Sequence, residues 1–479
     1  MRPTWIGATE SSIHVRFPLT RARTWAVALV TVLAFGDAQF AAALKYQPTQ
    51  SRLTTIETGF QPDELMSPTS GGSDSAPPAS AAAAGFSETY WSAFTDVDLP
   101  TLRRSAQSEP ETRFAEAMIQ LATGDIESAE RGFFVASHQR MDVNVAVASQ
   151  VMLATTLRYQ RKWRQLRDLP LTSILSAQDR LMTSDLEQWG RAFAAADTQV
   201  IEFPNEPMAM PLMLTTVGTP MIRISINGNS YDFWIDTGSS MTVVSSAVAA
   251  DANVVALSND TMTVRTFSGS APVKAAIVKR IEIGSIVINN CPAVIIDQSL
   301  MYLRTSEPGS PEKGIHVDGI IGWDTLREFD LTMDYAGGLI TLARPVRRTI
   351  GIGTERTLAW LGRPTVEIGS KVGGKLHFTL DTGAQSSFLN AIAIKRAGAT
   401  PQRADIHVFG IAKTGRKTNR AVPFLTVTIG NKPIRLQDVI VYGPVTSGLM
   451  NSDGFLGSDV GRSGPIHIDA TNGMFTVGS

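Results

Sequence analysis

The feature that most constrains this chain of 479 residues is a set of motifs that occurs twice in its second half. An apolar, strand-like run ends on Asp-Thr-Gly at Asp236, and another ends on Asp-Thr-Gly at Asp381, 145 residues later. Each is followed by a hydrophobic pair that ends in glycine, in Asp318–Gly322 ("DGIIG") and in Asp453–Gly457 ("DGFLG"). Because these spacings match, the sequence predicts two homologous β lobes within one chain.

The agreement between the two copies extends beyond these motifs. Each copy has an aspartate two residues after the final glycine, another aspartate twelve residues after it and a glycine sixteen residues after it. These positions are Asp324, Asp334 and Gly338 in the first copy and Asp459, Asp469 and Gly473 in the second. Matching offsets at so many points indicate an internal repeat.

The sequence around these motifs is typical of an all-β region. Short runs rich in β-branched residues alternate with Gly, Asn and Ser turns, which is the pattern expected of strands. The dipeptide Asn227-Gly228 separates two alternating runs and predicts a hairpin with a two-residue turn. We expect three segments here, which are lobe 1 at 211–345, a basic connector at 346–361 and lobe 2 at 362–478.

The N-terminal residues have the parts of a targeting segment. Basic residues up to Arg23 precede the apolar run Trp25–Phe35, and small residues follow at Ala41–Ala43. This order is that of a secretory signal, and the apolar run is shorter than the roughly 20 residues that span a bilayer. We expect residues 1–43 to be a signal peptide or an N-terminal anchor that associates with the membrane. The protein would then be periplasmic, secreted or anchored facing outside the cytoplasm.

Two segments separate this end from the β region. Residues 44–85 are poor in large apolar side chains and rich in Ser, Gly, Pro and Ala, which predicts a flexible linker. Residues 86–202 have apolar side chains at helical spacing on both sides of Gly124-Asp125, which indicates a helical hairpin followed by a second helical pair. These hairpins resemble tetratricopeptide units, and a plain helical spacer or prosegment is the alternative. Because both Asp-Thr-Gly motifs lie outside this module, we expect it to be dispensable for chemistry.

Composition excludes several classes of function. The net charge of −1 gives no reason to expect nucleic acid as a partner. The single cysteine, Cys291, excludes an intramolecular disulfide and a cysteine-rich zinc site. Its apolar neighbours predict a buried, unreactive thiol. The six histidines have no metal-ligand spacing, so we expect neither a metal nor another cofactor.

The paired loops resemble the active-site loops of aspartic peptidases, both pepsin-like and retropepsin-like. The resemblance covers about Leu212 to Val477 and rests on "DTGSS" and "DTGAQ" after apolar strands and on "IIG" and "FLG". A single Asp-Thr-Gly is an ordinary turn sequence, whereas a pair in equivalent positions is far more specific. The resemblance implies a mostly β fold, with two homologous β-barrel lobes that form a pseudo-dimer after the small α-helical module. The short lobes favour a fused relative of the retropepsin dimer, for which a monomer is sufficient for catalysis.

The chemistry of peptide hydrolysis explains why two carboxyls would be needed. Two carboxyls a few Å apart share one proton, because they cannot easily both ionise. One can then deprotonate a water molecule while the other protonates the carbonyl oxygen. The resemblance therefore implies Asp236 and Asp381 as the catalytic pair and a peptide or protein as the substrate.

The resemblance also implies supporting residues in the two loops, which are Thr237, Gly238, Ser239, Thr382, Gly383 and Ala384. Each glycine lets backbone N–H groups approach a carboxylate. Each threonine is expected to hydrogen-bond across to the opposite loop. The Ser239 hydroxyl is expected to hydrogen-bond the outer oxygen of Asp236, a donor that Ala384 lacks at the matching position.

Substrate-covering hairpins, or flaps, are expected at Thr266–Pro272 and at His407–Gly415. The function favoured by these features is that of an exported aspartic endopeptidase. One alternative is a catalytically silent protein that binds peptides or proteins and retains the fold. Another is a helical scaffold whose peptidase part is secondary. The presence of both aspartates favours the enzyme over these alternatives.

Overall fold

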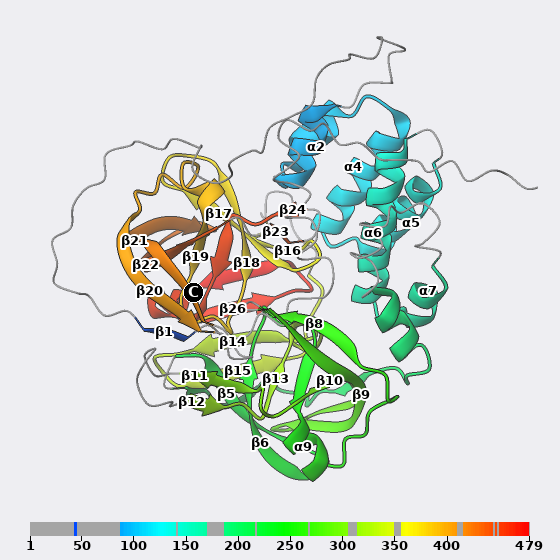
Figure 1. The fold of residues 1–479 in the computed structure, drawn as a ribbon, viewed down its shortest axis with the longest axis vertical. Helices are drawn as coiled ribbons and strands as arrows, with labels where there is room; N and C mark the ends of the chain where they lie inside the picture. Colours follow the sequence, from blue (N-terminus) through cyan, green and yellow to red (C-terminus); the bar gives the residue numbers. More distant parts are fainter. Residues whose placement is uncertain are drawn as a thin grey trace, which may run out of the picture.

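The computed structural model describes eleven ranges of the chain, which are 43–45, 87–139, 142–169, 186–215, 218–266, 269–304, 314–348, 356–409, 415–443, 446–447 and 450–478. The predicted signal peptide or anchor and the predicted linker lie outside these ranges, apart from the strand β1 (Ala43–Lys45). Among the helices described, none has the length and apolar character needed to cross a bilayer. Figure 1 shows a helical module beside a β region that is divided into two lobes.

The helical module is built from short helices, several of which are joined by tight turns. They are α2 (Glu88–Thr95), α3 (Leu99–Ser105), α4 (Glu109–Ala122), α5 (Ile126–Ser137), α6 (Val143–Tyr159) and α7 (Trp163–Asp168), and residues 186–193 are also helical. The predicted turn lies between α4 and α5, where Gly124 has φ 81° and the Asp125 side chain accepts a hydrogen bond from Ser128 N. A capping box of Ser108 and Glu111 begins α4 and satisfies N–H groups that the helix leaves free.

Lobe 1 is a closed barrel of six strands in the order β10-β7-β13-β6-β5-β9, with β9 paired back to β10. Its strands are β2 (Val200–Glu202), β4 (Met213–Leu214), β5 (Pro220–Ile226), β6 (Asn229–Ile235), β7 (Thr242–Ser245), β8 (Met262–Thr266), β9 (Gly269–Ile283), β10 (Ile286–Ile296), β11 (Tyr302–Arg304), β12 (Gly314–His316) and β13 (Gly319–Ile321), with helices α9 (Ser246–Asp251) and α10 (Trp323–Leu326). Asn227 and Gly228 both have positive φ, at 50° and 96°, between β5 and β6. The predicted two-residue hairpin turn is thereby confirmed.

Lobe 2 is a second closed barrel of six strands, in the order β21-β22-β19-β25-β18-β17, with β17 paired back to β21. Its elements are β16 (Leu358–Trp360), β17 (Pro364–Ser370), β18 (Lys375–Leu380), β19 (Phe388–Asn390), η1 (Ala391–Ala393), β20 (Gln402–Phe409), β21 (Gly415–Ile429), β22 (Lys432–Tyr442), β23 (Thr446–Ser447), β24 (Met450–Asn451), β25 (Gly454–Leu456) and η2 (Ser458–Ser463). The strand β1 pairs with β20 at the edge of this sheet.

A further sheet joins the two lobes. It has the order β27-β26-β14-β15-β3 and consists of β3 (Met208–Pro211), β14 (Asp330–Asp334), β15 (Leu339–Ala343), β26 (Ile466–Asp469) and β27 (Met474–Val477). The central pair is antiparallel, with Leu331 opposite Ile468, and both side chains are buried. Because each lobe contributes strands to one sheet, the lobes form a single unit. The predicted fold class, two barrel lobes after a helical module, is confirmed.

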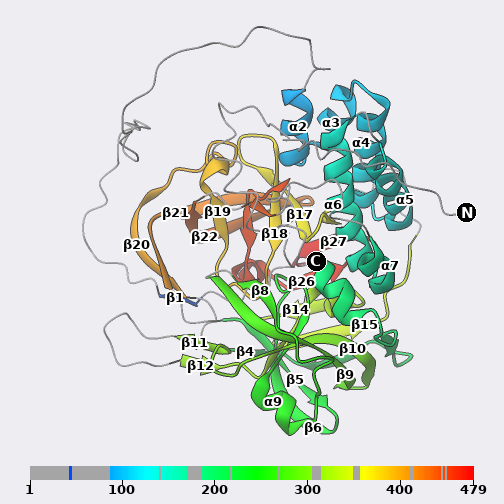
Figure 2. The same ribbon diagram turned by 45° about the vertical axis from the view of Figure 1, so that its right-hand side comes forward.

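The helical module packs against the β region. Figure 2 shows α6 and α7 beside the strands of both lobes. Buried apolar residues of the helices and of both lobes form one continuous hydrophobic cluster. Polar contacts add to it, because Asn451 of lobe 2 donates to Asp96 Oδ1 at 2.7 Å and Arg161 forms an ion pair with Glu328 of lobe 1 at 3.0 Å.

Cys291 lies on β10 in the interior of lobe 1. It is fully buried, and burial raises the pKa of its thiol to about 12. A thiol in such surroundings stays protonated and unreactive at ordinary pH. This agrees with the unreactive core cysteine predicted from the sequence.

Candidate active site

Asp236 and Asp381 each follow the last residue of a strand in the interior of a lobe. Asp236 comes directly after β6, and its N–H donates to the carbonyl of Ile321 on β13 at 3.1 Å. Asp381 comes directly after β18, and its N–H donates to the carbonyl of Leu456 on β25 at 3.0 Å. In both lobes the glycine-ending hydrophobic segment is the parallel neighbour of the strand that carries the aspartate. It therefore fixes the position at which the loop begins.

The two loops meet each other through their threonines. The N–H of Thr237 donates to Thr382 Oγ1, and the N–H of Thr382 donates to Thr237 Oγ1, both at 3.0 Å. The Thr382 hydroxyl in turn donates to the carbonyl of Ile235 at 2.8 Å. The contacts across the loops that the resemblance implied are therefore present. Because they are reciprocal, a movement of one loop must displace the other.

The two motif glycines pack against the carboxyls of the opposite lobe. A Cβ atom added at Gly238 would lie 2.5 Å from Asp381 Oδ1, and one added at Gly383 would lie 2.4 Å from Asp236 Cγ. A side chain at either position would therefore have to displace the opposite carboxyl. The absence of two side chains thus lets each carboxyl lie against the opposite loop, close enough for Asp381 to influence the pKa of Asp236.

The environment of Asp236 favours retention of a proton. The residue is fully buried, and Asp381 is only 3 % exposed. Burial raises the pKa of Asp236 to about 7, although the N–H groups of Ser239 and Gly238 donate to it and oppose this shift. A buried pair of this kind carries one proton between its two carboxyls over a range of pH. One member can then act as a base and the other as an acid.

The residues that follow the two motif glycines, Ser239 and Ala384, make hydrogen bonds that differ from the expected ones. The Ser239 hydroxyl donates to the carbonyl of Met241 at 2.8 Å, so the expected bond from this hydroxyl to Asp236 is wrong. The contact is made instead by the N–H of Ser239, which donates to Asp236 Oδ1 at 3.1 Å. In the second loop the N–H of Ala384 donates to Asp381 Oδ1 at the same distance. Both loops therefore use a backbone donor here, and the difference between Ser and Ala does not change it.

The hairpins expected to act as flaps are described only in part. The strands β8 and β9 pair with each other, as do β20 and β21. Residues 267–268 and 410–414, which join these strands, lie outside the described ranges. The role of both hairpins as substrate-covering flaps stays a prediction.

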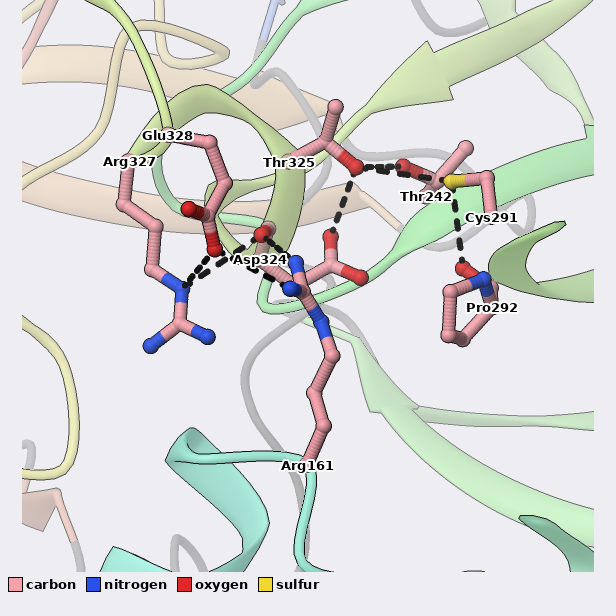
Figure 3. A network of polar contacts seen from close by, with 8 residues as sticks. All are labelled: Arg161, Thr242, Cys291, Pro292, Asp324, Thr325, Arg327 and Glu328. Atoms are coloured by element: carbon pink, nitrogen blue, oxygen red, sulfur yellow. Dashed lines mark hydrogen bonds and ion pairs between the residues drawn. The ribbon is translucent and has the colours of Figure 1, made fainter. Parts of the chain in front are cut away.

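Sequence reasoning gave no role to the polar groups behind the loop of lobe 1. Figure 3 shows them, with Arg161 reaching from the helical module to α10. A pocket lies at this junction, and its walls include Gly238 and Met241 of the catalytic loop, Tyr159 and Trp163 of the helices and Arg363 of lobe 2. The sequence gives little indication of a role for Arg161. This residue follows a predicted helix at the position where the turn of the first helical hairpin has Gly124.

Within the described ranges, no three His, Cys, Asp or Glu side chains are arranged to hold a metal ion. His377, which lies on the strand that Asp381 follows, has its Nε2 atom 3.8 Å from Glu367 Oε2. Its backbone N–H donates to Asp453 Oδ2 at 2.9 Å. This histidine therefore lies in a separate polar group.

Both lobes are similar to known proteins. Residues 222–325 and 365–460 each match the family model described as aspartyl protease. The chain is similar to a retropepsin-like aspartic protease from Rickettsia conorii, at 16 % identity over 30 % of this chain and 95 % of that one, with a TM-score of 0.20. It is also similar to an aspartic proteinase from Irpex lacteus, at 14 % identity over 57 % of this chain and 98 % of that one, with a TM-score of 0.35. The comparison with curated proteins gives no match.

Proposed function

Because the β region of this chain belongs to the aspartic peptidase family, we propose that the protein is an exported aspartic endopeptidase. It hydrolyses peptide bonds with a water molecule activated between Asp236 and Asp381. The observation that carries this proposal is the packing of each loop glycine against the carboxyl of the other lobe. That arrangement places two buried carboxyls in contact, which a fold without this chemistry would not need.

The mechanism follows from the shared proton. The ionised carboxyl of the pair accepts a proton from the water molecule as it attacks the carbonyl carbon of the substrate. The protonated carboxyl donates its proton to the carbonyl oxygen, which gives a tetrahedral diol. The proton taken from water then passes from the pair to the amide nitrogen, while a hydroxyl of the diol returns its proton to the pair. The carbon–nitrogen bond breaks, a carboxylic acid and an amine leave, and the pair again holds one proton. Each such acid or base role contributes about 10²- to 10⁴-fold to the rate.

The pH dependence follows from the same pair. Activity requires one proton on two carboxyls, so it is highest between their two macroscopic pKa values. Burial raises the pKa of Asp236 to about 7, which supports retention of that proton at acidic and mildly acidic pH. We expect activity to fall as the pH rises above about 7, when the pair loses its proton.

Export and the substrate class rest on different features. The basic, apolar and small-residue order of residues 1–43 supports export as a signal peptide or anchor. The family supports a peptide or protein as the substrate. The matched positions of the two lobes support an origin by duplication, and both catalytic loops lie in one chain, so a monomer would be sufficient for catalysis.

The alternative is a catalytically silent protein that binds peptides and retains the fold. The two functions are distinguished by incubating the purified full-length protein with a library of unfolded peptides at several pH values. Mass spectrometry then identifies any cleavage products. We expect internal peptide bonds to be cut, with the highest rate below pH 7. The Asp236→Asn variant, prepared in the same way, is the control for a contaminating peptidase. Binding without cleavage by the unaltered protein would support the silent alternative.

A further inference from the structure

The turn that joins α6 to α7 contains a residue in an unfavourable backbone conformation. The matching turn between α4 and α5 has Gly124 with φ 81°, whereas the turn after α6 has Arg161 with φ 56°. Left-handed backbone favours glycine, and a long side chain there is uncommon. Such an outlier persists where the surrounding structure requires it, and it motivates a search for what the side chain does.

The Arg161 side chain contacts lobe 1 directly behind the catalytic loop. Its Nη1 atom lies 3.0 Å from Glu328 Oε1, and its Nη2 donates to the carbonyl of Asp324 on α10. These contacts are drawn in Figure 3. The side chain is only 18 % exposed, so the ion pair is better shielded from water than a typical surface pair.

The helix α10 is in turn fixed to the loop that carries Asp236. The N–H of Trp323 donates to the carbonyl of Ser239 at 2.6 Å. A Cβ atom at Gly322 would lie 2.2 Å from the carbonyl oxygen of Met241, so the two backbones are in direct contact. A displacement of α10 would therefore move the catalytic loop with it.

The equivalent aspartate of lobe 2 has its partner within that lobe. Asp459 Oδ1 accepts a hydrogen bond from the Ser387 hydroxyl at 2.7 Å. The Oδ2 atom is shielded from water in both aspartates. In lobe 1, Asp324 Oδ1 has a longer contact, 3.5 Å from the Thr325 hydroxyl. Burial raises the pKa of Asp324, and the positive charge of Arg161 is the largest effect that opposes this rise. The largest positive influence on this carboxyl in lobe 1 thus comes from the helical module, whereas in lobe 2 the closest partner is a serine of the same lobe.

The residue at the end of α6 also connects the two lobes. The ring of Tyr159 stacks on Trp360 of lobe 2, with centroids 3.9 Å apart. On lobe 1 the guanidinium of Arg327 lies 3.7 Å from the centroid of the same ring. The end of α6 therefore contacts both lobes within three residues of Arg161.

We propose that Arg161 is a positioning residue for the Asp236 loop and that the helical module is part of the catalytic unit. The proposal rests on the proposed peptidase function and adds to it the element that holds lobe 1 in its active geometry. It replaces the sequence-based expectation that the helices are dispensable for chemistry. Arg161 reaches neither carboxyl of the pair, and it acts through α10.

The test is Arg161→Gly in the full-length protein. Glycine is favoured at this φ, so the turn should remain folded while the contacts to Asp324 and Glu328 are lost. We expect kcat to fall about 10- to 100-fold, as for a small displacement of a catalytic group, with a much smaller change in KM. Arg161→Lys keeps the charge but cannot make both contacts, and it should recover part of kcat.

Arg103→Ala is the matched control. Arg103 forms an exposed ion pair with Glu116 within the same module, at 2.9 Å, and its loss should leave kcat unchanged. Hydrogen–deuterium exchange of residues 236–245 and 319–328 is measured for the same proteins. Faster exchange of both segments in Arg161→Gly, but not in Arg103→Ala, is expected.

The outcomes separate this proposal from the peptidase function. If the unaltered protein cuts peptides and Arg161→Gly keeps the same kcat, the positioning role is wrong and the peptidase function stands. If the unaltered protein cuts nothing, the peptidase function fails, and exchange decides whether Arg161 holds the loop. Unchanged exchange in the variant overturns the proposal in either case.

Discussion

The two lobes differ in how each holds the aspartate two residues after its glycine-ending segment, Asp324 in lobe 1 and Asp459 in lobe 2. In lobe 2 the Ser387 hydroxyl donates to Asp459 at 2.7 Å and accepts from the N–H of Gly457 at 3.0 Å. In lobe 1 the matching position is Thr242, six residues after the catalytic aspartate as Ser387 is. Its hydroxyl pairs with Thr325 at 2.9 Å instead. The Asp324 carboxyl of lobe 1 has a longer contact with the Thr325 hydroxyl, at 3.5 Å, and lies among three arginines.

The two lobes are alike at the residues through which their catalytic loops contact each other. Thr237 and Thr382 make the same reciprocal contacts, and Gly238 and Gly383 pack in the same way against the opposite carboxyl. Residues that face their own counterpart cannot change separately, because each is the other's partner. Residues farther from the contact between the two loops, such as Thr242 and Ser387, have different neighbours in the two lobes. Their residue types can therefore differ between the lobes.

The largest effect is expected from filling the space between the two loops. Gly238→Ala and Gly383→Ala would each place a Cβ atom well inside van der Waals contact with the opposite carboxyl, at 2.5 and 2.4 Å. We expect either change to reduce peptide cleavage by about 100-fold or more, because the acid–base pair cannot form. Gly443→Ala, where an added Cβ would meet nothing within 4 Å, is the control and should cleave normally. A large difference in cleavage rate between Gly238→Ala and Gly383→Ala would show that the two loops do not contribute equally to the acid–base pair.

A second prediction concerns the pH dependence of stability in lobe 1. Burial raises the pKa of Asp324 from 3.8 to about 6. The folded protein therefore binds this proton more tightly than the unfolded chain does. The stability that it contributes is fully present below about pH 4 and is lost as the pH rises through about 6.

Asp324→Asn removes this titration. Relative to the unaltered protein, the free energy of unfolding of the variant should rise by up to about 3 kcal/mol between about pH 4 and pH 7. Urea denaturation at several pH values measures it. Asp459→Asn tests lobe 2 in the same way, since burial raises that pKa too. A difference between Asp324→Asn and the unaltered protein that is constant with pH would contradict the assignment.

The third prediction compares the two hydroxyl positions. Ser387→Ala removes the hydroxyl that donates to the buried Asp459 carboxyl and accepts from the N–H of Gly457. It should cost about 1–3 kcal/mol of unfolding free energy. Thr242→Val should cost less, about 1 kcal/mol, because Thr325 keeps contacts with Asp324 and Cys291, both at 3.5 Å. Chemical denaturation of both variants measures the difference. An equal or larger loss for Thr242→Val would show that lobe 1 also depends on its hydroxyl.

The repeated parts of the site could be predicted from the sequence because their chemistry requires particular residue types. Two aspartates, two threonines and two glycines lie where the motifs indicated, and the tight turn at Asn227-Gly228 follows from backbone preferences alone. The Ser239 hydroxyl was assigned to the wrong acceptor. A sequence gives the donor, but it does not show whether the Asp236 carboxylate or the Met241 carbonyl lies in line with it.

The contacts of the helical module could not be predicted. Arg161 reaches a carbonyl 163 positions away in the sequence, and no local pattern records such a contact. Helical periodicity indicates which face of α6 is apolar, but not which lobe packs on it. The positive φ of Arg161 could not be predicted either, because glycine and asparagine are the residue types that indicate this conformation in a sequence.

The measurement that tests the central claim most directly is the rate of peptide cleavage by Asp236→Asn, Asp381→Asn and the double variant, with circular dichroism to show that each is folded. Asn is nearly isosteric with Asp, so the loops should keep their contacts. We expect each single variant to lose at least about 100-fold in rate. The double variant should be little worse than either, because the two carboxyls act in one step. A folded single variant that keeps more than about a tenth of the activity would contradict a shared pair.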